Sequence, residues 1–175
     1  MNTDPLQSAF GAIYEAESDA VFRFCLFRVS DREQALDLTQ ETFIRLWQTI
    51  KKGEVMANAR SFVFTVAHNL VIDWYRRKKP ASLESMFETD EGDSSQIPEI
   101  MDDSDTALKV EGKHLIEAIN GLNPSYSHAV YLRFVEGLTP PEIGKIIGVS
   151  ANAASVRINR GLGQLKENLG YNKKK

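Results

Sequence analysis

The sequence has little of what enzymes commonly use for chemistry. It has one cysteine, Cys25, and three histidines that lie far apart without the spacing of metal ligands. It also has no glycine-rich phosphate loop and no serine or cysteine nucleophile motif. We therefore expect a protein that is not an enzyme and that binds no metal and no cofactor. The lone cysteine excludes an internal disulfide, and its place among Phe22, Phe24 and Phe27 favours a buried thiol.

Long hydrophobic runs are absent as well. No apolar stretch approaches the roughly 20 residues that cross a bilayer, and residues 1–10 lack the basic start of a signal peptide. These absences predict a cytoplasmic protein with no membrane insertion. No segment alternates with the period of a β-strand, whereas apolar residues recur at helical spacing along much of the chain. The sequence therefore predicts an all-α fold.

The chain as a whole also lacks an excess of positive charge. Its formal net charge is −3, although phosphate contacts require Lys and Arg. Residues 81–107, however, contain nine Asp and Glu and no Lys or Arg; without these nine, 15 of the 24 acidic residues remain against 21 basic ones, a net charge of +6. The acidic segment has no apolar periodicity and is rich in Ser, Gly and Asp. We predict a flexible acidic linker between two basic helical domains.

Three helices are predicted before the linker. The first runs over about residues 6–29 and the third over about 58–79, each with apolar residues on one face. Ser30 and Glu33 have the spacing of a capping box that begins the second helix, which ends at Gly53. Helices with such faces bury one another, so we expect a small bundle.

A helix-turn-helix is predicted after the linker, between about Thr139 and Leu165. It follows a helix over about residues 106–120 and another that begins at Asn123 and Pro124. Thr139 and Glu142, with two prolines between them, form a capping box for the first helix of the motif. Gly144 lies inside that helix, and we infer that the next helix approaches it closely. Residues 148–150 form the turn, in which Ser150 caps the second helix.

The second helix of the motif runs from Ala151 to about Leu169. Its apolar residues face inward, which leaves polar residues near its N-terminus for the outer surface. In a helix-turn-helix this part enters the major groove, where Arg pairs with guanine and Asn with adenine. An ordinary helical hairpin with a solvated polar face is the alternative. The candidate DNA-reading residues are Asn152, Ser155, Arg157, Asn159 and Arg160.

The third helix of the first domain carries a second nucleic-acid pattern. It contains Phe62, Phe64, Trp74 and Tyr75 and ends in the basic run 76–79. Aromatic rings that stack on unpaired bases, with cations for phosphate, are typical of single-strand binding. The same pattern fits core aromatics and cations that favour a helix C-terminus. The residues alone leave both interpretations open.

Three motifs together resemble the sigma-70 family of bacterial transcription initiation factors, in particular its small extracytoplasmic-function group. Residues 37–44 (DLTQETFI) resemble the polymerase-binding helix, residues 59–77 the promoter-melting and minus-10 segment, and residues 132–160 the minus-35-reading domain. The resemblance implies a melting domain of three or four helices over residues 1–80, an acidic linker over 81–105 and a helix-turn-helix domain over 106–172.

The resemblance also implies partners and site residues. The expected partners are promoter DNA and core RNA polymerase, through the coiled coil of its largest subunit and the flap of its second-largest subunit; an anti-sigma factor is a further partner that the resemblance allows. Residues 132–135 would meet the flap. The residues implied for the coiled coil are Asp37, Gln40, Glu41 and Phe43. Those implied for the minus-10 element are Phe62, His68, Asn69, Leu70, Trp74, Arg76, Arg77 and Lys78.

Some positions depart from the family pattern. Phe62 stands where Trp is usual and His68 where Arg is usual, and residues 153–155 replace the common Thr, Val and Lys. These changes leave the promoter sequence open. A stand-alone helix-turn-helix regulator is the alternative function. It would need a receiver or ligand-binding module, typically with parallel strands, whereas residues 1–80 predict only helices.

Overall fold

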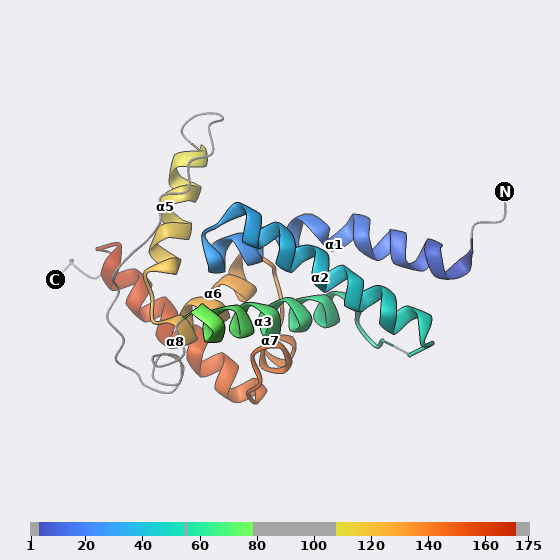
Figure 1. Cartoon of the computed structure of the whole chain (residues 1–175). Helices are drawn as coiled ribbons and strands as arrows, with labels where there is room; N and C mark the ends of the chain where they lie inside the picture. The colour runs from blue at the N-terminus through green and yellow to red at the C-terminus, as the bar shows by residue number, and fades with distance from the viewer. Residues whose placement is uncertain (1–3, 55, 79–107, 171–175) are drawn as a thin grey trace. The chain divides into compact units, whose positions relative to one another are not determined.

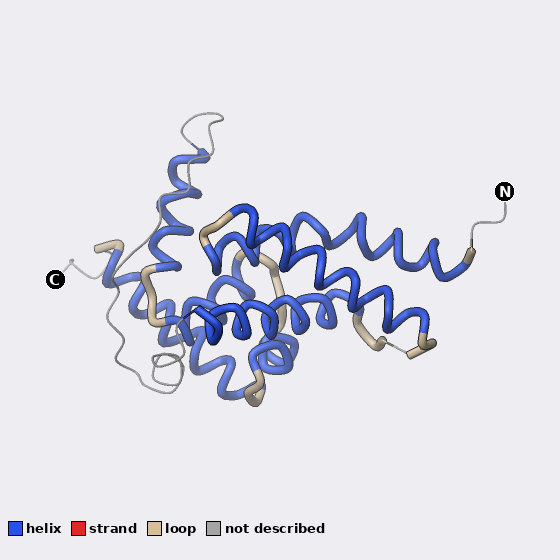
Figure 2. Tube along the Cα trace, viewed as in Figure 1, coloured by secondary structure: helices blue, strands red, loops and turns tan. Residues whose placement is uncertain are grey.

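The computed structural model of the chain describes residues 4–54, 56–78 and 108–170. All regular structure within these ranges is helical (Figure 2), which confirms the predicted fold class. The chain divides into two compact units, Met1–Lys78 and Lys79–Lys175. The predicted linker, residues 81–105, lies outside the described residues. Among the helices that are described, none is both long and apolar enough to span a bilayer.

The first unit is a bundle of three helices that pack against one another in pairs (Figure 1): α1 (Pro5–Val29), α2 (Arg32–Lys51) and α3 (Ala59–Lys78). Side chains of short polar residues cap all three. The carboxylate of Asp4 accepts a hydrogen bond from the Leu6 amide at 3.1 Å, and that of Asp31 accepts one from the Gln34 amide at 3.0 Å. Asn58 does the same for α3. These bonds satisfy amides that have no partner within the helix.

The predicted capping box of Ser30 and Glu33 is wrong. Ser30 ends α1 instead: it adopts a left-handed conformation with φ 53°, and its amide donates to the carbonyl of Leu26. Asp31, one residue later, caps α2. The junction between the two helices is so short that one residue must end the first while its neighbour begins the second.

The core of the first unit lies where the three helices meet. Phe24 of α1 and Phe64 of α3 are fully buried, with their rings edge to face at 5.7 Å. Such a pair adds specific geometry to the large apolar area it buries. Cys25 is also fully buried, as predicted, and burial raises the pKa of its thiol to about 12. The thiol is therefore a packing group and not a reactive one.

The second unit contains α5 (Leu108–Asn120), α6 (Pro124–Phe134), α7 (Pro140–Ile147) and α8 (Ala151–Asn168). α8 packs against α6 and α7, and α5 packs against α6. The predicted start of α5 at Thr106 lies outside the described residues. Asn123 caps α6 as predicted, since its side-chain oxygen accepts from the Ser125 amide at 3.0 Å. Apolar residues on the facing sides of these helices form the core, among them Ile119, Val130, Leu132, Ile143, Ile146, Ala154 and Ile158.

Candidate nucleic-acid interface

The start of α7 is fixed by the predicted residues. The Glu142 carboxylate accepts hydrogen bonds from the backbone amide of Thr139 at 2.8 Å and from its hydroxyl at 2.7 Å. Pro140 occupies the first turn, where no intrahelical partner for an amide exists. The preceding loop is held as well, because the Arg133 guanidinium donates to the carbonyl of Leu138 at 3.0 Å. α7 therefore begins at a fixed point relative to α6.

The turn between α7 and α8 is built on two glycines. Gly148 ends α7 with φ 77°, a conformation that costs glycine little. At Gly144 an added Cβ would lie 2.7 Å from the carbonyl oxygen of Val149 and 3.1 Å from the carbonyl carbon of Ser150. The expected close approach is present, but the atoms that approach belong to the turn and to the cap of α8. The Ser150 hydroxyl accepts from the Ala153 amide at 3.1 Å, as predicted.

A third glycine, Gly161, lets α8 pack closely on α6. An added Cβ there would lie 2.5 Å from a methyl carbon of Val130 and 3.2 Å from the Cβ of Tyr126. Gly161 carries no local signal in the sequence that marks it as a packing residue. It is buried, while Leu162, which was expected to face inward, is only half-buried. Ala154, Ile158 and Leu165, the other residues expected to face inward, are buried as predicted. The buried face of α8 is therefore the expected one, with Gly161 added where the helix meets α6.

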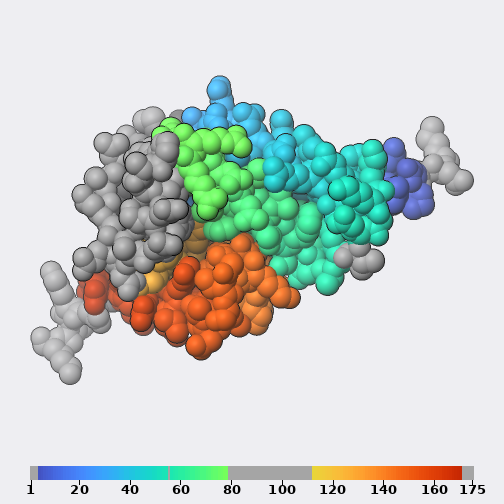
Figure 3. All heavy atoms as spheres, turned by 60° about the horizontal axis from the view of Figure 1, so that its bottom comes forward, coloured from blue at the N-terminus to red at the C-terminus, as the bar shows by residue number. Residues whose placement is uncertain are grey.

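The packing of α8 against α6 and α7 determines which side chains it presents near its N-terminus. Asn152, Asn159 and Arg160 are exposed, whereas Ser155 and Arg157 are half-buried. Figure 3 shows atoms of α7 and α8, in orange to red, on the face turned to the viewer. The five candidate residues therefore differ in their access to a partner. Val156, which sequence reasoning passed over, is 39% exposed on the same side as Asn152 and Arg160.

The candidate minus-10 residues of α3 divide into exposed and buried sets. Asn69, Arg76, Arg77 and Lys78 are exposed and Phe62 is half-buried. His68 and Leu70 are buried instead, 7% and 6% exposed, on the side that packs against the rest of the bundle. Their side chains therefore lie in the core of the first unit. The family resemblance, and not the helical spacing, implied minus-10 roles for both residues.

Burial also sets the charge of His68. Burial, together with the positive charge of Arg28, lowers the pKa of the imidazole to about 4. His68 is therefore neutral near pH 7 and cannot serve as the cation that the family pattern has there. Arg28 itself is buried, with its guanidinium carbon 5.4 Å from the centre of the Phe27 ring and 5.9 Å from that of Tyr75. The Tyr75 hydroxyl donates to the Arg28 carbonyl, which fixes the end of α3 to α1.

Trp74 is held in place by two neighbours. Its indole N–H donates to the side-chain oxygen of Gln34 at 3.0 Å, and the Lys78 ammonium lies 4.5 Å from the ring centre. Phe64 is a core residue. The core interpretation therefore holds for Phe64, whereas Trp74 is half-buried and anchors the basic end of α3 to α2.

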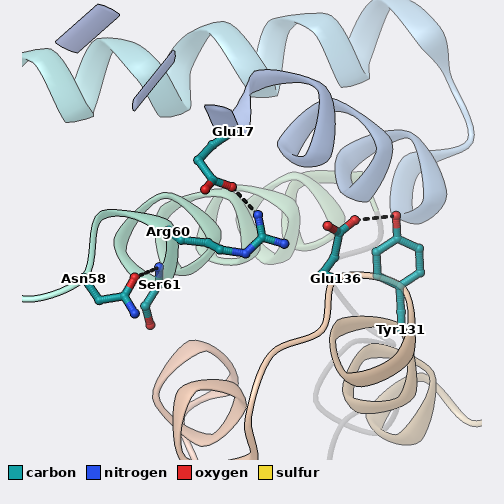
Figure 4. A network of polar contacts seen from close by, with 6 residues as sticks. All are labelled: Glu17, Asn58, Arg60, Ser61, Tyr131 and Glu136. Atoms are coloured by element: carbon teal, nitrogen blue, oxygen red, sulfur yellow. Dashed lines mark hydrogen bonds and ion pairs between the residues drawn. The ribbon is translucent and has the colours of Figure 1, made fainter. Parts of the chain in front are cut away.

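The other end of α3 is anchored to α1. Figure 4 shows the Arg60 guanidinium reaching Glu17 on α1, with the Ser61 amide donating to Asn58 at the start of α3. Arg60 also lies over the ring of Phe64 at 5.1 Å. With Tyr75 bonded at the far end, α3 is fixed at both ends, so its exposed side is a rigid surface.

An apolar groove of about 570 Å³ lies between α1 and α2. Two of the candidate polymerase-binding residues, Gln40 and Phe43, line it, and Asp37 and Glu41 lie on the same helix. Phe43 is only 3% exposed, because the ring of Tyr14 packs edge to face on it at 4.8 Å. Two exposed apolar residues at the groove, Tyr14 at 46% and Ile44 at 50%, were not among the candidate polymerase-binding residues. The remaining lining residues are Gln7, Phe10 and Trp47.

The segment expected to meet the polymerase flap, residues 132–135, is also divided. Leu132 is fully buried, whereas Phe134 is 56% and Val135 37% exposed. Just beyond them the Glu136 carboxylate accepts a hydrogen bond from the Tyr131 hydroxyl at 3.2 Å (Figure 4). The exposed pair at the end of α6 is therefore presented from a fixed turn.

The described part of the chain contains no candidate metal-binding site. No three His, Cys, Asp or Glu side chains gather there in a way that could hold an ion. The arrangement instead offers three surfaces: a polar helix start on α8, a basic helix end on α3 and an apolar groove between α1 and α2.

Comparison with known proteins identifies both units. The family model described as Sigma-70 region 2 matches residues 13–80, and that described as Sigma-70, region 4 matches residues 113–165. The RNA polymerase sigma factor CarQ of Myxococcus xanthus is 31% identical over 167 residues, which cover 95% of this chain and 92% of that protein. The ECF RNA polymerase sigma factor SigW of Bacillus subtilis is 27% identical and is covered to 90%.

Two further comparisons bear on length and fold. The ECF RNA polymerase sigma factor BldN of Streptomyces coelicolor is 30% identical over 151 residues; the match covers 83% of this chain but only 54% of that protein. Among solved structures, the sigma factor RpoE from Bartonella quintana, in complex with the anti-sigma factor NepR, has a TM-score of 0.66 at 19% identity. That match covers 94% of this chain and 99% of the solved one, and it shows a shared fold.

Proposed function

The chain belongs to the extracytoplasmic-function group of the sigma-70 family, the transcription initiation factors of bacterial RNA polymerase, and from this premise we propose how its surfaces divide the work. α8 reads the minus-35 element, α3 binds the minus-10 element, and the groove between α1 and α2 binds core polymerase. The observation that carries the proposal is the capped helix-turn-helix, in which a tight glycine turn presents the polar start of α8.

The minus-35 assignment is supported by exposure and chemistry. Arg160 and Asn159 are exposed, and guanidinium and amide groups are the ones that pair with guanine and adenine in the major groove. Arg157 and Ser155 are half-buried and would contribute from the edge of the surface. The polar face has few cations, so the non-specific part of the affinity must come from elsewhere. A polymerase that carries the factor to DNA supplies it.

The minus-10 assignment is supported by the end of α3. Arg76, Arg77 and Lys78 are exposed and suit the phosphates of a DNA backbone. Asn69 is exposed about two turns earlier, and its amide can pair with an unstacked base. In this proposal His68 and Leu70 do not touch DNA; from the core they hold α3 in the orientation that exposes Asn69.

The polymerase assignment is supported by the groove. Tyr14 and Ile44 leave apolar surface exposed on two adjacent helices, and α2 also carries Asp37 and Glu41, the latter paired with Arg45 at 2.9 Å. A partner helix with apolar residues and cations fits such a surface. We further propose that the chain acts in the cytoplasm, has no catalytic activity of its own, and is held by an anti-sigma factor, as the RpoE of the solved complex is.

A binding measurement with core polymerase tests this proposal. Ile44→Glu places a charge in the groove and should weaken binding of the chain to core polymerase by about tenfold or more, as expected for an apolar contact at the centre of an interface. Gln48→Glu adds the same charge one turn along α2, outside the groove lining, and should change binding by less than about twofold. Equal affinities of the two variants would contradict the assignment of the groove.

A further inference from the structure

The outer face of α8 contains one apolar side chain among polar ones. Val156 is 39% exposed. Its neighbours at one helical turn, Asn152 and Arg160, are both exposed. The opposite face of the helix is buried through Ala154 and Ile158. Val156 therefore belongs to the surface that the helix-turn-helix presents and not to the core beneath it.

Stability does not explain this valine. A β-branched residue in a helix has a lower propensity than Ala or Lys, because its χ1 angle is restricted against the preceding turn. At an exposed position it gains little from burial. The same stiffness is useful for recognition, since both methyl groups are held in one orientation before any partner binds.

The chemistry of the major groove offers one apolar group, the C5-methyl of thymine. The other base edges there present hydrogen-bond donors or acceptors, which a valine side chain would desolvate without pairing. We propose that Val156 contacts a thymine methyl group in the minus-35 element and so selects thymine at one position. This inference rests on the proposed function of α8 and adds a residue that hydrogen-bonding chemistry would not reveal.

The neighbours of Val156 place the contact. Asn152 and Arg160 lie four residues before and after it, and each offers hydrogen bonds to a base edge. The valine then makes an apolar contact between two polar ones along the helix. The thymine is expected inside the minus-35 element, between the base pairs that these two residues read.

Deoxyuridine tests the contact directly, because its base, uracil, differs from thymine only by the missing C5-methyl group. The test DNA is a promoter that the reconstituted holoenzyme transcribes from genomic fragments. Each thymidine of its minus-35 element is replaced in turn by deoxyuridine. At one position the wild-type holoenzyme should bind about two- to fivefold more weakly, the effect of one buried methyl group. Holoenzyme with Val156→Ala should bind the thymine and deoxyuridine promoters with equal affinity. Holoenzyme with Val156→Ile should still bind the thymine promoter more tightly.

Arg160→Ala is the matched control for a general loss of affinity. It should weaken binding to both promoters and keep their ratio. The inference is overturned if no replacement weakens promoter binding by the wild-type holoenzyme, or if the replacements weaken binding by Val156→Ala as much as by the wild type. It is also overturned if the minus-35 elements of transcribed fragments contain no thymine. Absence of any transcript would overturn the proposed function first, so the two failures are distinguishable.

Discussion

Gly144→Ala examines the turn on which the DNA-reading helix depends. In a free helix, this change adds about 1 kcal/mol of stability through helix propensity. Here the new methyl group would lie 2.7 Å from the Val149 carbonyl oxygen and 3.2 Å from that of Ser150. The turn cannot move away cheaply, because the Val149 amide donates to the Gly144 carbonyl at 2.8 Å. Overpacking of this kind costs about 1–3 kcal/mol, so after the propensity gain we expect a net destabilisation of up to about 2 kcal/mol.

The assay uses the distribution of tryptophan. Both tryptophans, Trp47 and Trp74, lie in the first unit. Urea unfolding followed by tryptophan fluorescence therefore reports the first unit, while far-ultraviolet circular dichroism reports helices of both. The part of the dichroism change that has no counterpart in fluorescence reports the second unit. Gly144→Ala should lower the urea midpoint of that part and leave the urea midpoint of the fluorescence change unchanged.

Gly163→Ala is the matched control. Gly163 is an exposed glycine of α8, and an added Cβ there meets no atom within 4 Å. This variant should gain up to about 1 kcal/mol from helix propensity alone. If Gly144→Ala proves as stable as Gly163→Ala, the close approach of the turn does not exist in solution and the argument for a rigid helix-turn-helix fails.

Three further predictions concern the first unit and the DNA contacts. Burial lowers the pKa of His68 to about 4 from its usual 6.5. As the pH falls, the unfolded chain therefore binds a proton at this residue before the folded chain does. The free energy of unfolding of the first unit should be unaffected by His68 above about pH 6.5 and should decrease as the pH drops toward 4. From pH 7 to 5 the loss should be about 2 kcal/mol, seen by urea unfolding with fluorescence detection, and His68→Gln should remove most of it; an unchanged slope would mean that another group titrates. Asn69→Ala should reduce promoter opening, measured by permanganate reactivity of thymines, more than closed-complex binding, and an equal loss in both would argue against base capture. Arg160→Ala should cost about 1–3 kcal/mol in promoter discrimination, measured as the ratio of transcription from matched and mutated minus-35 elements, and an unchanged ratio would remove Arg160 from the reading surface.

Local signals in the sequence predicted the helix-turn-helix well. Thr139, Glu142 and Ser150 act through hydrogen bonds within three residues, so their roles can be read without knowing the rest of the fold. Ser30 shows the limit of such signals, because Ser30 and Asp31 are adjacent residues that both suit a cap. Only the packing of α1 against α2 decides which of them begins the second helix.

Exposure was harder to predict because it depends on neighbouring helices. In α3 the apolar spacing placed Leu70 on the side that packs, and it is buried there. The same spacing did not indicate that His68, a polar residue, also faces the core while Asn69 faces outward. Gly161 could be recognised as a packing residue only once α6 lay beside it. Ile44 and Val156 resemble core residues in a linear sequence, and their exposure makes them candidates for binding.

Run-off transcription on genomic fragments tests most directly whether this chain gives promoter specificity to polymerase. Core polymerase and the chain are supplied separately and together. We expect discrete transcripts only when both are present, from fragments that share two short elements at a constant spacing, and no site-specific binding of the chain alone to those fragments. Transcripts no more specific than those of core polymerase alone, together with tight binding of the isolated chain to a duplex site, would contradict this function and indicate a stand-alone regulator.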